Sequence, residues 1–476
     1  MKNNKKRRKV LLLSPPNSRI VLRANYCSNE SKASYYLPPC DLLIISAILN
    51  AHHDLHVIDA IAENLDKQET KERIDNYDPE IIIFMTGSIS EQEDMLFLGH
   101  LKKDRPETVL IGSGDMLLFA PIDNLKRYLF IDAILMDYAS KDVLAYIDGH
   151  LSELEQVIFR VNGEIISPWR PGKGVKHYGD HRERQESKIG IPRHDLFPVK
   201  KYRNAIGQRF PFTVTMLTFG CAYICSFCPM EKLLFRYRDL SEVIEEMRFI
   251  QSQGIREVFF FDQTFASKRD YFLEFCRRMF EEKIDLTWSC ETRVDVMDEE
   301  ILTWMKRAGC HTINFGVETA NEAMLNSQKK DIVNNQYTKI FSLCDNFGIK
   351  TLGHFIVGLP GENQKTVERT LQFAIELDCD YASFNIAEAP LGTSLRTESL
   401  KKSWISEDSE AQAGFLANAY PVSGNNSFEE VVRWRDELVK GFYLRPSYIF
   451  KRLTAIRSWN QAVVLVREGT SLLRSL

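Results

Sequence analysis

The stretch Gly220-Cys-Ala-Tyr-Ile-Cys-Ser-Phe-Cys-Pro229 decides how this chain is interpreted. It places Cys221, Cys225 and Cys228 in a CxxxCxxC pattern directly after the apolar residues 213–219, which predict a β-strand. Three thiols at the mouth of one strand can converge on one metal centre. A ligand set made only of soft sulfur favours an iron–sulfur cluster, zinc or copper(I).

The number of cysteines in this loop bears on which metal is expected. A structural zinc site usually takes four ligands from two CxxC-type pairs. The other seven cysteines are isolated, at positions 27, 40, 276, 290, 310, 344 and 379. A [4Fe–4S] cluster normally takes four thiolates, one for each iron. Three cysteines therefore leave one iron open to a substrate or cofactor, and a zinc clip or unrelated thiols are the alternatives.

Length and composition restrict the class of protein. A chain of 476 residues predicts about two to four domains. Its net charge of −4 gives no global argument for binding nucleic acid or an anionic membrane surface. No apolar run reaches the ~18 residues that would predict a membrane span. The scattered cysteines and the absence of a visible signal peptide predict a reducing cytoplasm rather than a disulfide framework.

The first 150 residues alternate apolar runs with helical patterns. Strands are expected at 10–14 and 81–86, and they contain the continuously apolar runs 10–13 and 81–84, as strands covered on both faces require. Such alternation predicts a doubly wound, Rossmann-like α/β domain at 1–150, with ligands beyond the carboxyl ends of its strands. Further strands are expected at 55–59, 108–112 and 131–136, and helices at 40–51, 68–77, 90–103 and 119–128.

A second α/β region follows at 211–395. Six strand–helix units predict a partial (β/α)₆ barrel whose reactive face lies at the carboxyl ends of its strands, and the three cysteines come just past the first strand. The expected strands are 212–218, 257–261, 285–289, 312–316, 350–357 and 381–386. Residues 151–210 lack periodicity and predict a linker. The tail, 396–476, is helical, with segments at 428–442 and 446–457 that suit either a substrate-side lid or packing helices.

The cysteine spacing, with Phe227 before the third cysteine, resembles the radical S-adenosylmethionine (radical SAM) superfamily. The resemblance implies that Cys221, Cys225 and Cys228 hold a [4Fe–4S] cluster whose open iron chelates the amino and carboxylate groups of SAM. In that family an electron from the cluster cleaves SAM to a 5′-deoxyadenosyl radical. An electron donor such as flavodoxin or ferredoxin is then expected as a partner.

The same resemblance implies SAM contacts at three strand ends. Asp262 and Gln263 end the second strand, where the family has a turn that binds the SAM amino group; this sequence looks like its Asp-Asp-x-Phe variant with Gln in the second place. Arg293 follows the third strand, where a guanidinium fork suits a carboxylate. Glu318 ends the fourth strand, against the amino or ribose groups of SAM.

The fifth strand carries a motif that looks like the family's adenine-binding strand, at 353–362. Ile356 and Gly358 are the contacts expected there, because glycine lets a flat ring approach the backbone closely. His354 on the same strand is a candidate either for catalysis or for an ordinary core histidine.

The N-terminal domain looks like the cobalamin-binding domain of the cobalamin-dependent radical SAM enzymes. Gly112 and Gly114 lie where those domains place a glycine turn beside the nucleotide tail of the corrin. Domains that ligate cobalt carry Asp-x-His-x-x-Gly after the first strand, but residues 14–20 here are Ser-Pro-Pro-Asn-Ser-Arg-Ile. The resemblance therefore implies bound cobalamin without a histidine lower ligand, and a domain that serves only as a scaffold is the alternative.

These features together predict a cobalamin-dependent radical SAM C-methyltransferase that acts on an unactivated carbon of a small molecule. A radical cyclase, ring-rearranging or oxidising enzyme of the same superfamily is the first alternative. A non-catalytic corrinoid- or SAM-binding protein is the alternative from a different functional class. No nucleic-acid patch is visible in the sequence, and the substrate cannot be read from it.

Overall fold

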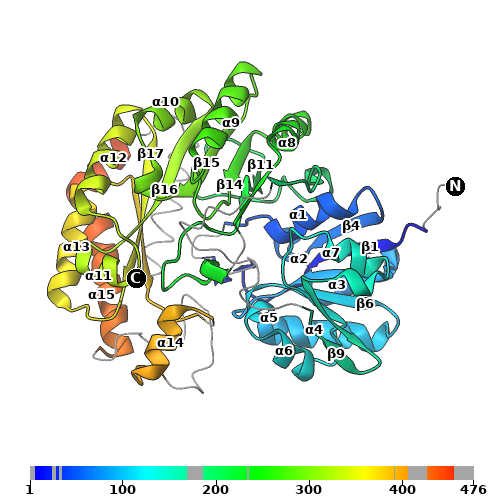
Figure 1. Cartoon of the computed structure of the whole chain (residues 1–476). Helices are drawn as coiled ribbons and strands as arrows, with labels where there is room; N and C mark the ends of the chain where they lie inside the picture. The colour runs from blue at the N-terminus through cyan, green and yellow to red at the C-terminus, as the bar shows by residue number, and fades with distance from the viewer. Residues whose placement is uncertain are drawn as a thin grey trace.

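The computed structural model describes residues 6–23, 28–31, 35–168, 186–232, 235–390, 392–405 and 426–454. Two α/β lobes lie side by side, an N-terminal one coloured blue to cyan and a larger one coloured green to yellow (Figure 1). Cys27, one of the isolated cysteines, and the last residues of the predicted helix 446–457 lie outside the described part of the chain.

The N-terminal lobe contains a seven-stranded sheet of order β4-β1-β5-β6-β7-β8-β9. Its first five strands are parallel, which confirms the predicted parallel sheet, and β8 and β9 add an antiparallel edge. The strands are β1 (Lys9–Ser14), β4 (Asp54–Asp59), β5 (Ile81–Met85), β6 (Val109–Ser113), β7 (Ala133–Leu135), β8 (Val157–Val161) and β9 (Glu164–Ile166). Because β8 and β9 belong to this sheet, the linker starts later than residue 151.

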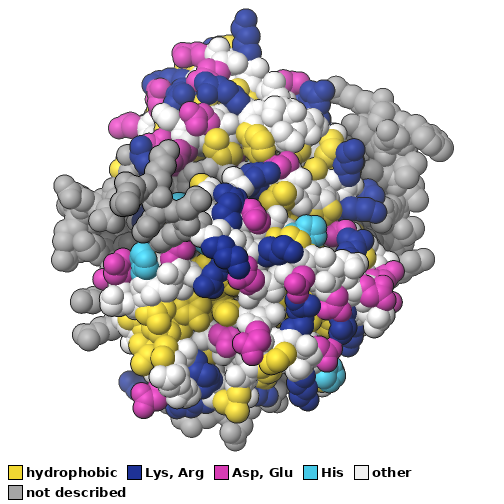
Figure 2. Space-filling view, turned by 90° about the vertical axis from the view of Figure 1, so that its right-hand side faces the viewer, with side chains coloured by type: hydrophobic (Ala, Val, Ile, Leu, Met, Phe, Trp, Pro, Cys, Tyr) yellow, Lys and Arg dark blue, Asp and Glu magenta, His cyan; other side chains and the backbone are white. Residues whose placement is uncertain are grey.

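Helices cover both faces of this sheet, so β5 is buried throughout and β1 is buried after Lys9. The short β2 (Val21–Leu22) and β3 (Asn29–Glu30) pair with each other outside it. The helices are α1 (Cys40–Leu49), α2 (Ala60–Glu63), α3 (Lys67–Tyr77), α4 (Glu91–Asp104), α5 (Asp115–Phe119), α6 (Pro121–Arg127) and α7 (Asp142–Ile147). On the outer face of this lobe acidic and basic side chains are intermixed (Figure 2).

The second lobe is built on six parallel strands in chain order, β11-β14-β15-β16-β17-β18. This order bears out the six expected units. The strands are β11 (Phe212–Thr215), β14 (Glu257–Phe260), β15 (Thr287–Thr292), β16 (Cys310–Glu318), β17 (Lys350–Val357) and β18 (Tyr381–Ile386). The helices are α8 (Leu240–Ser252), α9 (Arg269–Glu281), α10 (Glu299–Arg307), α11 (Glu322–Ser327), α12 (Asn334–Asn346), α13 (Gln364–Glu376), α14 (Ser394–Lys401), α15 (Phe428–Tyr443) and α16 (Pro446–Thr454).

Two boundaries of the expected strands were wrong. The first strand stops at Thr215, and Thr218–Phe219 forms a separate strand, β12, which pairs with β13 (Arg236–Arg238) in a small sheet with β10 (Glu186–Ser187). The third strand runs on to Thr292, so Glu291 lies within it. The reason is physical: Asp262 accepts hydrogen bonds from the backbone between β11 and β12, and sheet pairing with β16 continues to Thr292.

The position of helix α15 shows whether this part of the C-terminal region is a lid or a packing helix. Val431, Trp434, Leu438 and Phe442 are buried in the same core as the barrel helices. The Tyr443 hydroxyl donates to the carbonyl of Ala382 on β18 at 2.7 Å. This helix therefore packs against the wall of the barrel and is not a lid.

Candidate functional site

The cysteine loop begins where β12 ends. Gly220 has φ 70°, a left-handed conformation that glycine adopts without steric cost, and it turns the chain into the loop. All three cysteine thiols are free and partly exposed. The backbone N–H of Ser226 donates to the Gln328 carbonyl at 3.1 Å, and the Ser226 carbonyl accepts from Leu395 at 2.9 Å. The loop is therefore held from two elements that are distant in sequence.

Cationic side chains lie near the middle cysteine. Arg293 Nη1 lies 3.7 Å from Cys225 Sγ, and Asp295 holds the same guanidinium in a fork at 2.8 and 2.9 Å. The guanidinium also lies over the ring of Tyr223, 3.9 Å from its centroid. Burial raises the pKa of the Cys225 thiol, and the charges of Lys330 and Arg293 oppose that rise. The thiol pKa is raised on balance, but the two cations favour the thiolate, which is the form that binds metals.

These observations test whether a cluster fits. Within the described ranges, no three His, Cys, Asp or Glu side chains converge closely enough to hold one metal ion. In a [4Fe–4S] cluster each thiolate joins a different iron, so its ligands do not meet at one point. Three free thiols in one loop, with cations beside the middle one, therefore fit an iron–sulfur cluster.

Asp262 lies just past the end of β14, at the expected position. Its carboxylate, however, points toward the segment that leads into the cysteine loop. It is fully buried and accepts from the backbone N–H groups of Leu217 at 3.0 Å and Thr218 at 2.6 Å, and from the Thr218 hydroxyl at 2.6 Å. Burial raises its pKa to about 6, and these hydrogen bonds oppose the rise. Asp262 thus fixes the chain three residues before Cys221. Its contact with SAM stays a prediction, as does that of the partly exposed Gln263.

Glu318 is held by a residue that the sequence did not single out. The Lys330 ammonium, which is also buried, lies 2.5 Å from Glu318 Oε1 and donates to the Gly316 carbonyl at 2.8 Å. Glu318 itself has φ 66°, a strained conformation for a residue with a side chain. Glu318 and Lys330 both influence the pKa of Cys225 electrostatically, so the pair lies close to the cysteine loop. In the sequence, Lys330 is marked only by its position three residues after the end of α11 at Ser327.

Ile356 and Gly358 lie on and just after β17. Ile356 packs in a small apolar cluster together with Phe227 of the cysteine loop, which is a position consistent with its expected contact. Gly358 has φ 91°, and a Cβ there would meet Val431 Cγ1 at 2.7 Å. Its glycine is therefore required by the backbone turn and by close packing of α15, and its contact with adenine stays a prediction.

A second polar group lies at the carboxyl side of the barrel strands. His354 Nε2 lies 4.0 Å from Glu291 Oε1, and both side chains are about one-third exposed, so His354 is not a core histidine. Burial, with the charge of Glu291 as a smaller cause, raises the pKa of Tyr35. Because Tyr35 precedes α1 in the N-terminal lobe, the two lobes meet at this point. Sequence reasoning missed Glu291 and Tyr35.

The expected cobalamin edge of the N-terminal sheet is closed by the chain itself. Arg23 is buried and forms a fork with Asp94, at 2.6 and 3.0 Å. Ser28 donates to Asp115 through its backbone N–H and its hydroxyl, both at 2.8 Å. These contacts cross the ends of β1, β5 and β6.

The two glycines expected at this edge have packing roles. A Cβ at Gly112 would meet Leu117 Cδ1 at 2.4 Å, and one at Gly114, which has φ 129°, would meet the Thr86 carbonyl at 1.8 Å. In the direction of a side chain, neither glycine opens onto free space, so both are required by the packing of the sheet edge. Their cobalamin contacts stay a prediction.

Comparison with known families identifies the second lobe. The model of the radical SAM superfamily matches residues 215–374, which include the cysteine loop and β14 to β17. The chain carries a radical SAM domain. Such a domain indicates an enzyme, and it implies a [4Fe–4S] cluster and SAM as cofactors.

Relatives extend the similarity to the whole chain. An uncharacterized methyltransferase of Pyrococcus horikoshii is 27% identical over 93% of this chain and 94% of that protein. The anaerobic magnesium-protoporphyrin IX monomethyl ester cyclase of Rubrivivax gelatinosus is 26% identical over 77% of this chain and 67% of that protein.

Solved structures share the fold of both lobes. The cobalamin-dependent SAM radical enzyme OxsB, with aqua-cobalamin and SAM bound, has a TM-score of 0.70 at 12% identity, over 98% of this chain and 72% of that one. The radical SAM methyltransferase TsrM of Kitasatospora setae has a TM-score of 0.61 at 17% identity, over 83% of this chain and 76% of that one.

Proposed function

We propose that this radical SAM enzyme uses cobalamin as a second cofactor and methylates an unactivated carbon of a small-molecule substrate. The observation that carries the proposal is that the two lobes meet at the carboxyl ends of their strands. Asp137, just past β7, pairs with Arg236 beside the cysteine loop at 2.5 Å, and Tyr138 lies edge-on to Phe219, with ring centroids 5.9 Å apart. Tyr35 of the first lobe is near Glu291 of the second.

The cofactors would supply the hard chemistry, namely reductive cleavage of SAM at the cluster and carriage of a methyl group by the corrin. The residues of this chain would bind these cofactors and orient them. Cys221, Cys225 and Cys228 would hold the cluster. Asp295 occupies the fork of Arg293 and leaves its Nη1 beside Cys225, so Arg293 would place a positive charge next to the cluster. Lys330 holds Glu318 in one orientation at the end of β16.

Cobalamin binding requires a change at the sheet edge, because Arg23 and Ser28 cover it. Support for bound cobalamin comes from the shared fold with OxsB. Support for methyl transfer comes from relatives named as methyltransferases. One of them is the bacteriochlorophyllide d C-12(1)-methyltransferase of Chlorobaculum tepidum, which is 25% identical over 53% of this chain and 55% of that protein.

A cyclase or oxidising reaction without methyl transfer is the second candidate. The cyclase relatives favour it, and so does the Glu291–His354 pair, because a carboxylate beside an imidazole can accept and donate protons. A reducing cytoplasm with a flavodoxin or ferredoxin as electron donor suits either reaction.

The experiment is an anaerobic assay of the reconstituted protein with methyl-labelled SAM and candidate substrates. Label in a product carbon supports methyl transfer. Formation of 5′-deoxyadenosine without label in the product supports the cyclase or oxidising reaction. Intact SAM, in protein that contains iron and sulfide in the amounts of one cluster, would instead indicate a non-catalytic binding protein.

A further inference from the structure

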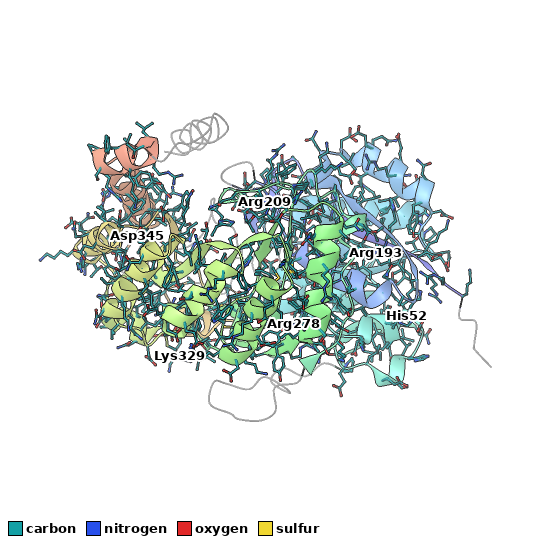
Figure 3. The ribbon with its side chains drawn as sticks, turned by 90° about the horizontal axis from the view of Figure 1, so that it is seen from above. His52, Arg193, Arg209, Arg278, Lys329 and Asp345 are labelled. Carbon is teal, nitrogen blue, oxygen red and sulfur yellow. The ribbon has the colours of Figure 1, made fainter. Side chains whose placement is uncertain are left out.

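The strands β15, β16 and β17 direct successive side chains alternately to the outer helices and to the interior of the barrel. Helices α9 and α12, which carry the labelled Arg278 and Asp345, belong to this outer layer (Figure 3). The outward side chains are buried in the core with the helices: Trp288 and Cys290, Ile313 and Phe315, and Phe355 and Val357. The side chains between them point to the interior, and four are polar: Ser289, Glu291, Asn314 and His354. We call these four side chains the inner polar face.

The register of the strands brings the inner polar face together. Glu291 pairs with Asn314 across β15 and β16, and Ser289 lies two residues before Glu291 on the same side of the sheet. His354 lies on the next strand, and its Nε2 is 4.0 Å from Glu291 Oε1. Tyr35 of the first lobe approaches the same carboxylate, because the charge of Glu291 contributes to the raised pKa of Tyr35.

The inner polar face contains buried atoms that could form hydrogen bonds. Ser289 Oγ, Asn314 Oδ1 and His354 Nε2 are shielded from solvent and have no hydrogen-bond partner among the described residues. Ser289 and Asn314 are 0% and 6% exposed. Buried polar atoms in folded proteins are nearly always paired, so several unpaired ones on one face indicate a surface that binds a hydrogen-bonding molecule.

The charge of Glu291 indicates which molecule is suited to this face. Its side chain is 37% exposed, and none of the described lysines and arginines forms an ion pair with it. The Lys330 ammonium, which a Cβ at Gly316 would meet at 2.7 Å, is already paired with Glu318. A carboxylate can only accept hydrogen bonds, and so can an amide oxygen. Two such acceptors on paired strands suit a group with several N–H donors, and a protonated amine also neutralises the charge.

We propose that the inner polar face binds an amino group of the substrate, with Glu291 paired to the ammonium and Asn314 Oδ1 accepting a second hydrogen bond. The substrate is then a small cationic amine and not a carboxylic acid or a hydrocarbon. This rests on the proposed function in one respect, that the molecule held inside the barrel is the one that is methylated. The amino group of SAM is the less suitable occupant, because the open iron of the cluster is expected to take that group.

The test measures binding and needs no turnover. Reconstituted full-length protein with SAM, kept anaerobic and without reductant, is titrated with benzylamine and with benzyl alcohol, and binding is followed by saturation-transfer nuclear magnetic resonance. The two probes have nearly the same shape, but only benzylamine is charged. Wild type should bind benzylamine about tenfold or more tightly than benzyl alcohol, and Glu291→Gln should remove most of this difference. Glu274→Gln is the matched control, because it removes the same charge from an exposed position on α9.

A second variant separates binding from a structural role. Asn314 Oδ1 has no described hydrogen bond to lose, so Asn314→Leu should unfold at the same temperature as wild type or higher. The same variant should bind benzylamine severalfold more weakly. A clearly lower unfolding temperature with unchanged benzylamine affinity would show that this amide serves the fold and would contradict its place in the site.

Three further outcomes would overturn the proposal. The first is equal affinity of wild type for the two probes, including no binding of either. The second is a Glu291→Gln variant that binds benzylamine as tightly as the Glu274→Gln control. The third is a Glu291→Gln variant whose SAM affinity, measured by calorimetry, falls as much as its benzylamine affinity, which would assign the face to SAM. Because methyl transfer is not measured, failure of this binding test and failure of the labelling assay remain distinguishable.

Discussion

The buried charge network beside the carboxyl end of β11 gives the sharpest stability prediction. Glu246 of α8 is fully buried, and its Oε2 lies 2.6 Å from Arg238 Nη1 while its Oε1 accepts from Thr215 Oγ1 at 2.6 Å. His194 of the linker lies 2.8 Å from the same Oε1. Arg238 also donates to the Met216 carbonyl at 3.0 Å. The network therefore ties the linker to the strand that leads into the cysteine loop.

Glu246 is the carboxylate that forms an ion pair with Arg238, and Glu246→Gln removes its charge. An uncompensated buried guanidinium costs about 3–5 kcal/mol in the free energy of unfolding. The double change Glu246→Leu/Arg238→Met removes both charges. It should cost less than Glu246→Leu and Arg238→Met added together, because it leaves no buried charge unpaired. The Met216 and Gly190 carbonyls still lose a donor, and the Thr215 hydroxyl and the His194 ring lose the Glu246 carboxylate, at about 1–3 kcal/mol each.

The assay is urea unfolding followed by the fluorescence of Trp288 and Trp434, which are both buried in the barrel. Glu282→Gln is the control, because its pair with Arg248 is at the surface and should contribute only about 0–1 kcal/mol. A loss below about 1 kcal/mol for Glu246→Gln, or a double variant whose loss equals the sum of the single losses, would refute the reasoning.

The network also predicts a pH dependence. Burial tends to raise the pKa of Glu246, but Arg238 and His194 outweigh it, so the net pKa lies below its usual value of 4.5. A carboxylate whose pKa is lowered on folding contributes stability above its unfolded pKa and loses it as the pH falls through the folded pKa. The difference in stability between wild type and Glu246→Gln should therefore be full at pH 7 and shrink below pH 4.5.

Three further predictions concern the site. Cys225→Ala should lose most of the iron bound after reconstitution, as measured by iron and sulfide analysis, whereas Cys276→Ala, in the core, should retain it; equal iron in both would argue against the assigned ligand. Lys330→Met should weaken SAM binding about tenfold or more in calorimetry, because it leaves the buried Glu318 carboxylate unpaired. Lys330→Arg should weaken it much less. An unchanged SAM affinity of the Lys330→Met variant would contradict this prediction. Cob(II)alamin, if bound, should show no splitting from a histidine nitrogen in its electron paramagnetic resonance spectrum, since residues 14–20 contain no histidine, and such a splitting would disprove the prediction.

Much of the fold could be predicted because the buried strands are continuous apolar runs. β1 and β5 are buried along almost their whole length, and their sequences leave little choice of element. The break between β11 and β12 could not be predicted, because it depends on Asp262, which is distant in sequence. The edge strands β8 and β9 were missed because residues 157–166 follow the predicted domain end and look like a linker.

The site was predictable in position but not in pairing. Sequence order places polar residues at strand ends, and Asp262, Arg293 and Glu318 are all found there. It does not show where each side chain points. Asp262 turns to the backbone of its own lobe, and Glu318 to Lys330, because a buried carboxylate must find donors nearby.

The relation between the lobes follows from α1. All ten residues of this helix are buried, as expected of a helix that is apolar on nearly every side. One side packs on the N-terminal sheet, and the same core includes Phe212 and Val214 of β11. The lobes therefore share one core, and separating them would expose it to water at roughly 25 cal/mol for each Å². A cofactor or substrate must then enter through the segments at the facing strand ends and not by opening of the two lobes. Among the described residues of these segments, Arg23 and Ser28 make the contacts that cover the sheet edge.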